Sequence, residues 1–161
     1  MRLYIPYWIN GVLPPTVIKS IGAQTIQCEI VVISTLRTRN RDSEYENRNM
    51  IFDLAKAEDV FLMQDSDVSH KRTDNIHSML HYLAEHPTVG YVALRHGAIL
   101  VHTNHVDIGC CAVRRLAIKD SYLTQQHSEC CCVGLKNLVE SNGYVAKYLD
   151  AAERIQLELR Q

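Results

Sequence analysis

The sequence predicts an α/β protein whose core is a sheet of mostly parallel strands. Apolar runs lie within positions 29–34, 60–64 and 89–94, and the first of them is made of β-branched residues; such runs are typical of strands buried on both faces. The segments between them carry apolar residues at helical spacing. Strands that alternate with helices in this way are joined by right-handed crossovers into one sheet.

The first half of the chain gives the clearest element boundaries. A first strand is expected at 3–6, and the prolines at 14–15 suit the start of a helix. Ser43, with Glu46 three positions later, predicts a capping box for the second helix. Thr73 is expected to cap the third helix. The strands and helices of this half therefore alternate regularly.

The pattern is looser in the second half of the chain, where shorter apolar segments follow one another. The elements expected there are strands at 99–102 and 106–113, a helix at 128–142, a strand at 145–149 and a terminal helix at 151–160.

Composition limits the classes of partner. The 161 residues suffice for one domain, and the net charge of −1 gives no general attraction for nucleic acid. The sequence has no long apolar run, so we expect a soluble cytoplasmic protein without a transmembrane segment. Attachment to a membrane surface and homo-oligomer formation both stay open. The loop at 35–42, with Arg37, Arg39 and Arg41, is expected to be solvated.

The six cysteines contain no C-x-x-C pair, which argues against a standard zinc site. Neighbouring cysteines point in different directions on a strand or a helix, so the whole run 130–132 is not expected to bind one metal. Buried free thiols are the favoured interpretation over disulfides. His102 and His105 lie in a predicted loop, where one of them could complete the shell of a metal ion.

Two aspartates, Asp65 and Asp67, follow the strand at 60–64. On an extended chain they point to the same side, and two carboxylates held close together repel each other. A divalent cation such as Mg²⁺ or Mn²⁺ resolves this repulsion, and such ions are commonly shared with the phosphates of a substrate. The simpler alternative is a pair of solvated acids. Ligands of α/β sheets bind beyond the carboxyl ends of the strands, which favours a site here.

The order of several short motifs resembles that of GT-A-fold glycosyltransferases, especially the family 2-like group. This resemblance extends over nearly the whole chain. The matching pieces are Ile5-Pro6 with Asn10 and Leu13, the run Ser20 to Thr25, the strand Glu29 to Ile33, Arg48-Asn49, Asp65-Ser66-Asp67 as a D-x-D motif, Gly109 with Arg114-Arg115, and Glu129 with Gly143-Tyr144.

The resemblance implies a Rossmann-like αβα sandwich that transfers a sugar from a UDP- or GDP-linked donor to a glycan, protein or lipid acceptor. Residues 1–95 would form the nucleotide-binding half and 96–161 the acceptor side of a single domain. Asp65 and Asp67 would hold Mn²⁺ or Mg²⁺. The other residues expected to contact the donor are Pro6, Tyr7, Trp8, Ser34, Arg48 and Ser66, together with Asp65 itself.

An inverting transferase also needs a carboxylate base. The resemblance points to Glu129, Asp120 is the nearby alternative, and a third interpretation has no base at all. Two other functions stay open: a non-catalytic module that binds nucleotide sugars on the same fold, and a haloacid-dehalogenase-like phosphatase whose first aspartate is a nucleophile.

Overall fold

The computed structural model describes residues 1–9, 11, 13–96, 105–124 and 130–158 of the chain. Its centre is a six-stranded sheet with the order β2-β1-β3-β6-β5-β7. The pairs β1–β2, β1–β3 and β5–β7 are parallel, whereas β6 runs antiparallel to both of its neighbours. The predicted α/β class with a mostly parallel mixed sheet is therefore confirmed.

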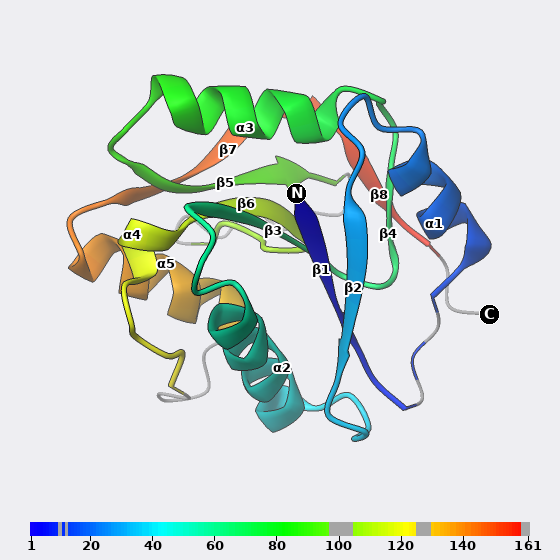
Figure 1. Cartoon of the computed structure of the whole chain (residues 1–161), viewed down its shortest axis with the longest axis horizontal. Coiled ribbons are helices and arrows are strands. Elements are labelled where there is room, and N and C mark those ends of the chain that lie inside the picture. Colours follow the sequence, from blue (N-terminus) through cyan, green and yellow to red (C-terminus); the bar gives the residue numbers. More distant parts are fainter. Residues whose placement is uncertain (10, 12, 97–104, 125–129, 159–161) are drawn as a thin grey trace.

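Helices cover both faces of this sheet (Figure 1). The elements in chain order are β1 (Arg2–Tyr7), α1 (Pro15–Gly22), β2 (Glu29–Ser34), α2 (Arg41–Leu54), β3 (Val60–Gln64), β4 (Val68–His70), α3 (Asn75–Glu85), β5 (Val89–Arg95), β6 (Cys110–Arg114), α4 (Arg115–Ile118), α5 (Cys131–Ser141), β7 (Val145–Glu153) and β8 (Ile155–Leu157).

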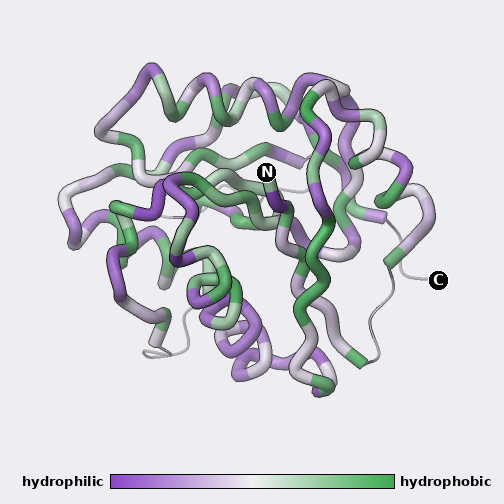
Figure 2. Tube along the Cα trace, in the orientation of Figure 1, coloured by the Kyte–Doolittle hydropathy of each residue, from purple (hydrophilic) through white to green (hydrophobic). Residues whose placement is uncertain are grey.

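The side chains of the central strands alternate between two hydrophobic cores. Leu62 of β3 packs into the core beneath α1 and α3. Its neighbours Phe61 and Met63 pack into the opposite core, beneath α2, α4 and α5. Figure 2 shows the hydrophobic character of these strands against the mixed pattern of the helices. Burial on both faces explains why the strand sequences are continuously apolar.

The starts of two helices differ from the prediction. The capping box of α2 is formed by Asn40, whose side chain accepts a 2.9 Å hydrogen bond from the Ser43 backbone, while Ser43 Oγ accepts from the Asn40 backbone at 3.0 Å. Ser43 is thus the third residue of the helix and not its cap. Asp74, one residue after the predicted Thr73, occupies the cap of α3 without a side-chain capping bond.

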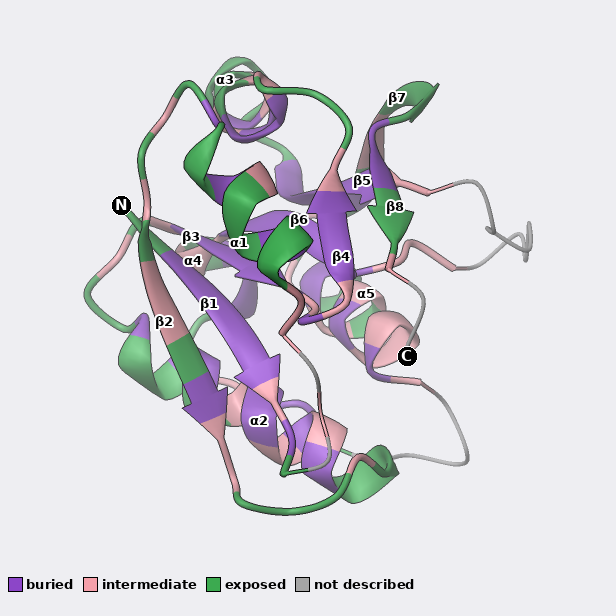
Figure 3. Ribbon diagram, turned by 90° about the vertical axis from the view of Figure 1, so that its right-hand side faces the viewer, coloured by how far each residue is buried: buried purple, intermediate pink, exposed green. Residues whose placement is uncertain are grey.

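The predicted C-terminal helix at 151–160 is wrong. Strand β7 continues to Glu153, and β8 pairs with β4 in a separate two-stranded antiparallel sheet (Figure 3). The local sequence favours a helix by propensity. Tertiary contacts decide otherwise, because Ile155 is fully buried and Arg154 pairs with Asp150 at 2.6 Å.

The other differences lie in the second half of the chain. The strand predicted at 106–113 is confined to β6, and α5 begins at Cys131. The short α4 and β4 were not predicted. The strand predicted at 99–102 lies outside the described residues. Within the described part of the chain, no helix has the length and apolar character needed to cross a membrane.

One edge of the sheet gathers the strand ends that carry polar residues. The carboxyl ends of β1, β2 and β3 lie there, because these strands are parallel and in register. The first residue of antiparallel β6, Cys110, pairs with Gln64 at the end of β3. The segments that follow β3 and precede β6 therefore meet at this edge.

Candidate functional site

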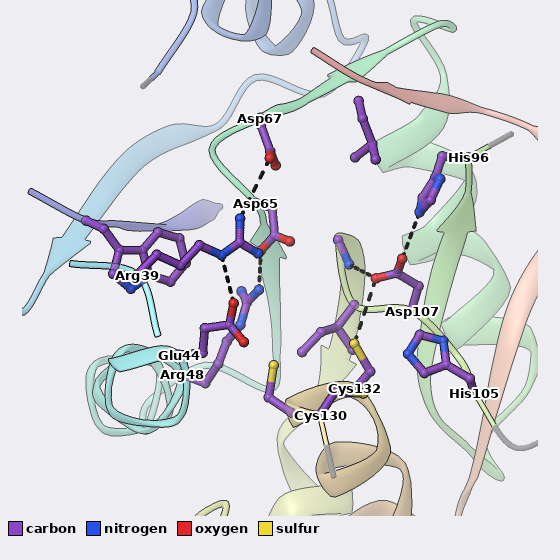
Figure 4. A pocket seen from close by; sticks show the side chains of 15 residues that line it. Arg39, Glu44, Arg48, Asp65, Asp67, His96, His105, Asp107, Cys130 and Cys132 are labelled. Atoms are coloured by element: carbon purple, nitrogen blue, oxygen red, sulfur yellow. Dashed lines mark hydrogen bonds and ion pairs between the residues drawn. The ribbon is translucent and has the colours of Figure 1, made fainter. Parts of the chain in front are cut away.

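A cavity of about 410 Å³ opens at this edge of the sheet. Its volume lies within the range of small-molecule sites. Figure 4 shows that polar side chains from several elements point into it. The lining residues are Trp8, Arg39, Glu44, Arg48, Asp65, Asp67, His96, His105, Asp107, Ile108, Gly109, Cys130, Cys131, Cys132 and Leu157.

Asp65 and Asp67 both line the cavity, but strand alternation is not the reason. Strand β3 ends at Gln64, and the two aspartates lie in a tight turn in which the Val68 backbone N–H donates to the Asp65 carbonyl at 3.2 Å. The Asp65 N–H donates to the carbonyl of Gly109 at 2.8 Å. The side chains are 17% and 19% exposed, so both carboxylates are mostly enclosed.

Two arginines neutralise this pair. Arg48 of α2 forms a buried ion pair with Asp65. Arg39 lies 3.7 Å from Asp67 and 2.7 Å from Glu44, and its guanidinium lies 4.9 Å from the centre of the Trp8 ring. The expectation of a solvated Arg39 is therefore wrong. We call the set Asp65, Asp67, Arg39 and Arg48 the carboxylate side.

On the carboxylate side, burial disfavours the charged forms of Asp65 and Arg48. Burial raises the pKa of Asp65 above its ordinary value, while Arg48 and Arg39 oppose the rise. Burial likewise acts against the charge of Arg48, but Asp65 keeps the pKa of Arg48 raised. Among the described residues, Arg48 Nη1 is buried without a hydrogen-bond acceptor. Two carboxylates beside an unsatisfied guanidinium suit a hard divalent cation carrying an anionic ligand.

The opposite side of the cavity carries sulfur and imidazole groups. His105, Cys130 and Cys132 place their ligand atoms within 4.8 Å of one another. Asp107 lies beside them and accepts from the Gly109 N–H at 2.8 Å; its other oxygen lies 2.8 Å from His96 Nε2. We call His105, Cys130 and Cys132 the thiol side.

The two thiols of the thiol side differ in acidity. The pKa of Cys130 is lowered, first because Cys132 donates a hydrogen bond to it, and further by the Val133 backbone N–H and by His105, while burial opposes this. The pKa of Cys132 is raised well above its ordinary value, because its thiol hydrogen-bonds to Cys130 and Cys131 and because it is buried. Within this pair the Cys130 thiol is therefore the more acidic one.

Several predicted donor contacts lie near the cavity rather than in its wall. Pro6 is buried in β1, and the Tyr7 hydroxyl donates to the Gly11 carbonyl at 3.0 Å. Ser34 accepts from the Leu36 N–H at 3.2 Å, and Ser66 is buried within the carboxylate turn. Trp8 does line the cavity; it is 2% exposed, and its indole N–H donates to Ser43 Oγ at 2.9 Å.

The two candidate bases have different outcomes. Glu129 lies outside the described residues, as does His102. Asp120 follows α4 at the opposite edge of the sheet, where its 95% exposed side chain pairs with Arg115 at 3.1 Å. It does not line the cavity, so this placement does not suit a base that acts there. Asp120 lies far from the cavity because β6 begins at the cavity and runs away from it, and α4 and Asp120 follow its far end.

Three solved structures with a similar fold are informative. TarS of S. aureus, in complex with UDP-GlcNAc, has a TM-score of 0.71 and 13% identity over all of this chain and 59% of its own. The mannosyltransferase PcManGT of Pyrobaculum calidifontis, in complex with GDP-Man and Mn²⁺, has a TM-score of 0.66 and 13% identity; the match covers 91% of this chain and 54% of PcManGT. The catalytic domain of Drosophila β1,4-galactosyltransferase 7 has a TM-score of 0.61 and 18% identity; the match covers 96% of this chain and 66% of that domain.

These likenesses show that the chain has the GT-A fold. The sequence matches no family model, and it matches no curated protein either. The chain spans about three fifths of the length of TarS. The expected Rossmann-like αβα sandwich is confirmed, and the carboxylate pair follows β3, the third strand of the chain.

Proposed function

We propose that this protein is a metal-dependent glycosyltransferase that uses a nucleotide-diphosphate sugar as donor. The observation that carries the proposal is the pair of enclosed carboxylates, Asp65 and Asp67, in the turn after β3 of a GT-A fold. Similar structures hold UDP-GlcNAc or GDP-Man with Mn²⁺, which supports the same class of donor here.

The diphosphate would be held by the carboxylate side. Asp65 and Asp67 would bind Mn²⁺ or Mg²⁺, which supplies a positive charge to stabilise the departing nucleoside diphosphate. Arg48 Nη1, which is buried without an acceptor, would donate to a phosphate oxygen. Arg39 already lies within 3.7 Å of Asp67 and would turn its guanidinium toward the same anion.

The base and ribose would lie at the ends of β1 and β2. Tyr7 and Ser34 are partners in the strand register there, and the partly exposed Tyr7 ring would contact a planar base. The backbone of Pro6 and the buried Ser66 would shape this end of the pocket. Trp8 is almost fully buried, and its ring would hold Arg39 in place behind the base.

The acceptor, whether a glycan, a protein or a lipid, would enter from the side of residues 96–161. Glu129 is our candidate base, since its neighbour Cys130 lines the cavity. A carboxylate there would take the proton of the acceptor hydroxyl as the new glycosidic bond forms and the bond to the nucleoside diphosphate breaks.

Calorimetric titration of UDP and GDP tests donor binding. We expect binding of one nucleotide in the presence of Mn²⁺, weakened at least tenfold in Asp67→Ala, because loss of a ligand exceeds the 10- to 100-fold cost of losing an outer-shell contact. Asp59→Ala is the matched control, since this exposed aspartate precedes β3 at the far edge. Equal binding by Asp67→Ala would remove the assigned role of the carboxylates.

Turnover separates the enzyme from a binding module of the same fold. Hydrolysis or transfer of the sugar from the nucleotide that binds should be detectable in the wild type and lost in Glu129→Gln. Metal-dependent binding without any release of nucleoside diphosphate would instead support the non-catalytic module.

A further inference from the structure

The thiol side of the cavity forms a cluster of metal-ligating atoms that the proposed function does not use. Its members come from two separate segments. His105 precedes β6, Cys130 is the cap residue of α5, and Cys132 is in the first turn of that helix. Their ligand atoms all lie within 4.8 Å of one another. Residues remote in sequence thus converge on one point of the cavity wall.

We propose that His105, Cys130 and Cys132 form a second metal site, which binds a thiophilic divalent cation such as Zn²⁺. Tetrahedral zinc has Zn–S bonds of about 2.3 Å and Zn–N bonds of about 2.0 Å, so its ligand atoms lie roughly 3.5–4 Å apart. The cluster is close to this spacing, and small side-chain rotations would complete it. The inference does not depend on the proposed glycosyltransferase activity.

The ligand chemistry distinguishes this site from the carboxylate side. Asp65 and Asp67 offer hard oxygen donors, which suit Mn²⁺ and Mg²⁺. Two sulfurs and one imidazole nitrogen favour zinc and other thiophilic ions. All three ligand atoms face the same cavity and lie within 4.8 Å of one another, so one ion can reach all of them.

A carboxylate lies next to the proposed ligands. Cys132 Sγ lies 3.9 Å from a carboxylate oxygen of Asp107, and the other oxygen of Asp107 lies 2.8 Å from His96. Metal binding would remove the Cys132 proton and with it this hydrogen bond, and the negative charge of Asp107 would then compensate part of the charge of the ion. Figure 4 shows Asp107 between His96 and Cys132 on the wall that faces Asp65.

Three protein ligands leave the fourth position of a tetrahedral ion for a water molecule or another small ligand. All three residues line the cavity, so that position is reachable from the same space that would receive a donor or an acceptor. Neither the missing C-x-x-C spacing nor the different directions of neighbouring cysteines predicts this cluster, which uses only the first and third cysteines of the run. Cys130 and Cys132 converge because the first is in extended backbone before the helix and the second is inside it.

Cobalt provides a direct test. The reduced, metal-free full chain is titrated with Co²⁺, and the sulfur-to-cobalt charge-transfer band and the tetrahedral d–d bands are recorded. We expect one ion per chain to give the sulfur-to-cobalt band, and Zn²⁺ to displace that ion. Cys132→Ser and His105→Ala should each weaken binding at least tenfold. The matched control is Cys28→Ser, which removes a cysteine that precedes β2 at the far edge and should not alter the titration.

Asp67→Ala should leave the cobalt bands unchanged, which separates this site from the carboxylate side. Alkylation of wild-type protein gives an independent readout: Zn²⁺ should protect Cys130 and Cys132 but not Cys28, as mapped by mass spectrometry. The absence of charge-transfer bands, bands that persist in Cys132→Ser, or rapid alkylation of Cys130 with Zn²⁺ present would each overturn the proposal. The last result would mark a reactive thiol instead.

Discussion

The two sides of the cavity neutralise their charges in different ways. On the carboxylate side, Asp65 and Asp67 are opposed by the fixed cations Arg48 and Arg39. On the thiol side, a hydrogen bond from Cys132 rather than a cation lowers the pKa of Cys130. Under the two proposals above, a metal ion would join an existing ion network on one side and replace a thiol proton on the other. Ligand type would then separate a hard from a soft cation within one cavity.

The largest expected effect concerns the buried pair on the carboxylate side. Arg48→Met leaves Asp65 buried without its main cation and should lower the free energy of unfolding by about 3–5 kcal/mol. Chemical denaturation measures this change. Added Mn²⁺ should stabilise the variant more than the wild type, because the ion replaces the missing positive charge.

Arg37→Met is the control for that experiment. Arg37 pairs with Glu46 at 3.3 Å, but its side chain is 59% exposed, so the loss should stay below about 1 kcal/mol. If Arg48→Met were as mild as Arg37→Met, the carboxylates would not need a fixed cation, and the contrast between the two sides would fail.

Acid should lower the stability of the protein by protonating His70, a buried histidine that contacts the strand end next to the carboxylate side. His70 accepts a 3.0 Å hydrogen bond from Asn75 at Nδ1 and donates a 2.8 Å bond to Gln64, which precedes the aspartate turn. Burial lowers the pKa of His70 to about 4. The unfolded chain, with a histidine pKa near 6.5, binds more protons below that pH, so stability falls between about pH 6.5 and pH 4, by up to about 3 kcal/mol.

His70→Gln should flatten this part of the stability profile, measured by denaturation at a series of pH values. The control His81→Gln changes a 59% exposed histidine on α3 and should keep the wild-type slope. A wild-type slope in His70→Gln would mean that another group carries the acid sensitivity.

A smaller effect should act on the thiol side alone. Gly90 of β5 lies against the helices that cover this half of the sheet: an added Cβ would lie 2.7 Å from Ala117 Cβ and 2.9 Å from Tyr144 Cβ, and would also collide with Val139 of α5. Gly90→Ala should therefore displace α5, which carries Cys132, at a cost of about 1–3 kcal/mol.

The same variant should weaken cobalt binding to the thiol side and leave Mn²⁺-dependent nucleotide binding intact. Gly22→Ala, at a position with open space around the added Cβ, should be neutral or slightly stabilising. Equal losses at both metal sites in Gly90→Ala would indicate that the two sides are not mechanically separate.

The sequence predicted the first half of the fold well because its strands are buried on both faces. The runs at 29–34 and 60–64 match β2 and β3 as observed. Strand β8 escaped prediction, since residues 151–160 have helical propensity, whereas 151–153 are extended as part of β7, which pairs with β5, and 155–157 are extended because they pair with β4. Contacts between distant segments cannot be read from local spacing.

The site shows the same limit. The spacing of Asp65 and Asp67 pointed to the cavity, although a turn rather than strand alternation brings them together. Arg39 was assigned to solvent because nothing in its loop indicates that Trp8 and Glu44 lie beside it. For the thiol side, Cys130 and Cys132 were not expected to share a metal, and the fold alone brings His105 to them.

The pairing of β4 with β8 also has a consequence in time. The Asp67 carbonyl accepts a 2.6 Å hydrogen bond from the Glu158 N–H, and Ser69 contacts the same residue across a separation of 89 positions. At ribosomal rates, residues this far apart emerge on the order of ten seconds from each other. During that interval a nascent chain can pair β1 with β2, but its aspartate turn lacks both of these contacts until Glu158 has emerged.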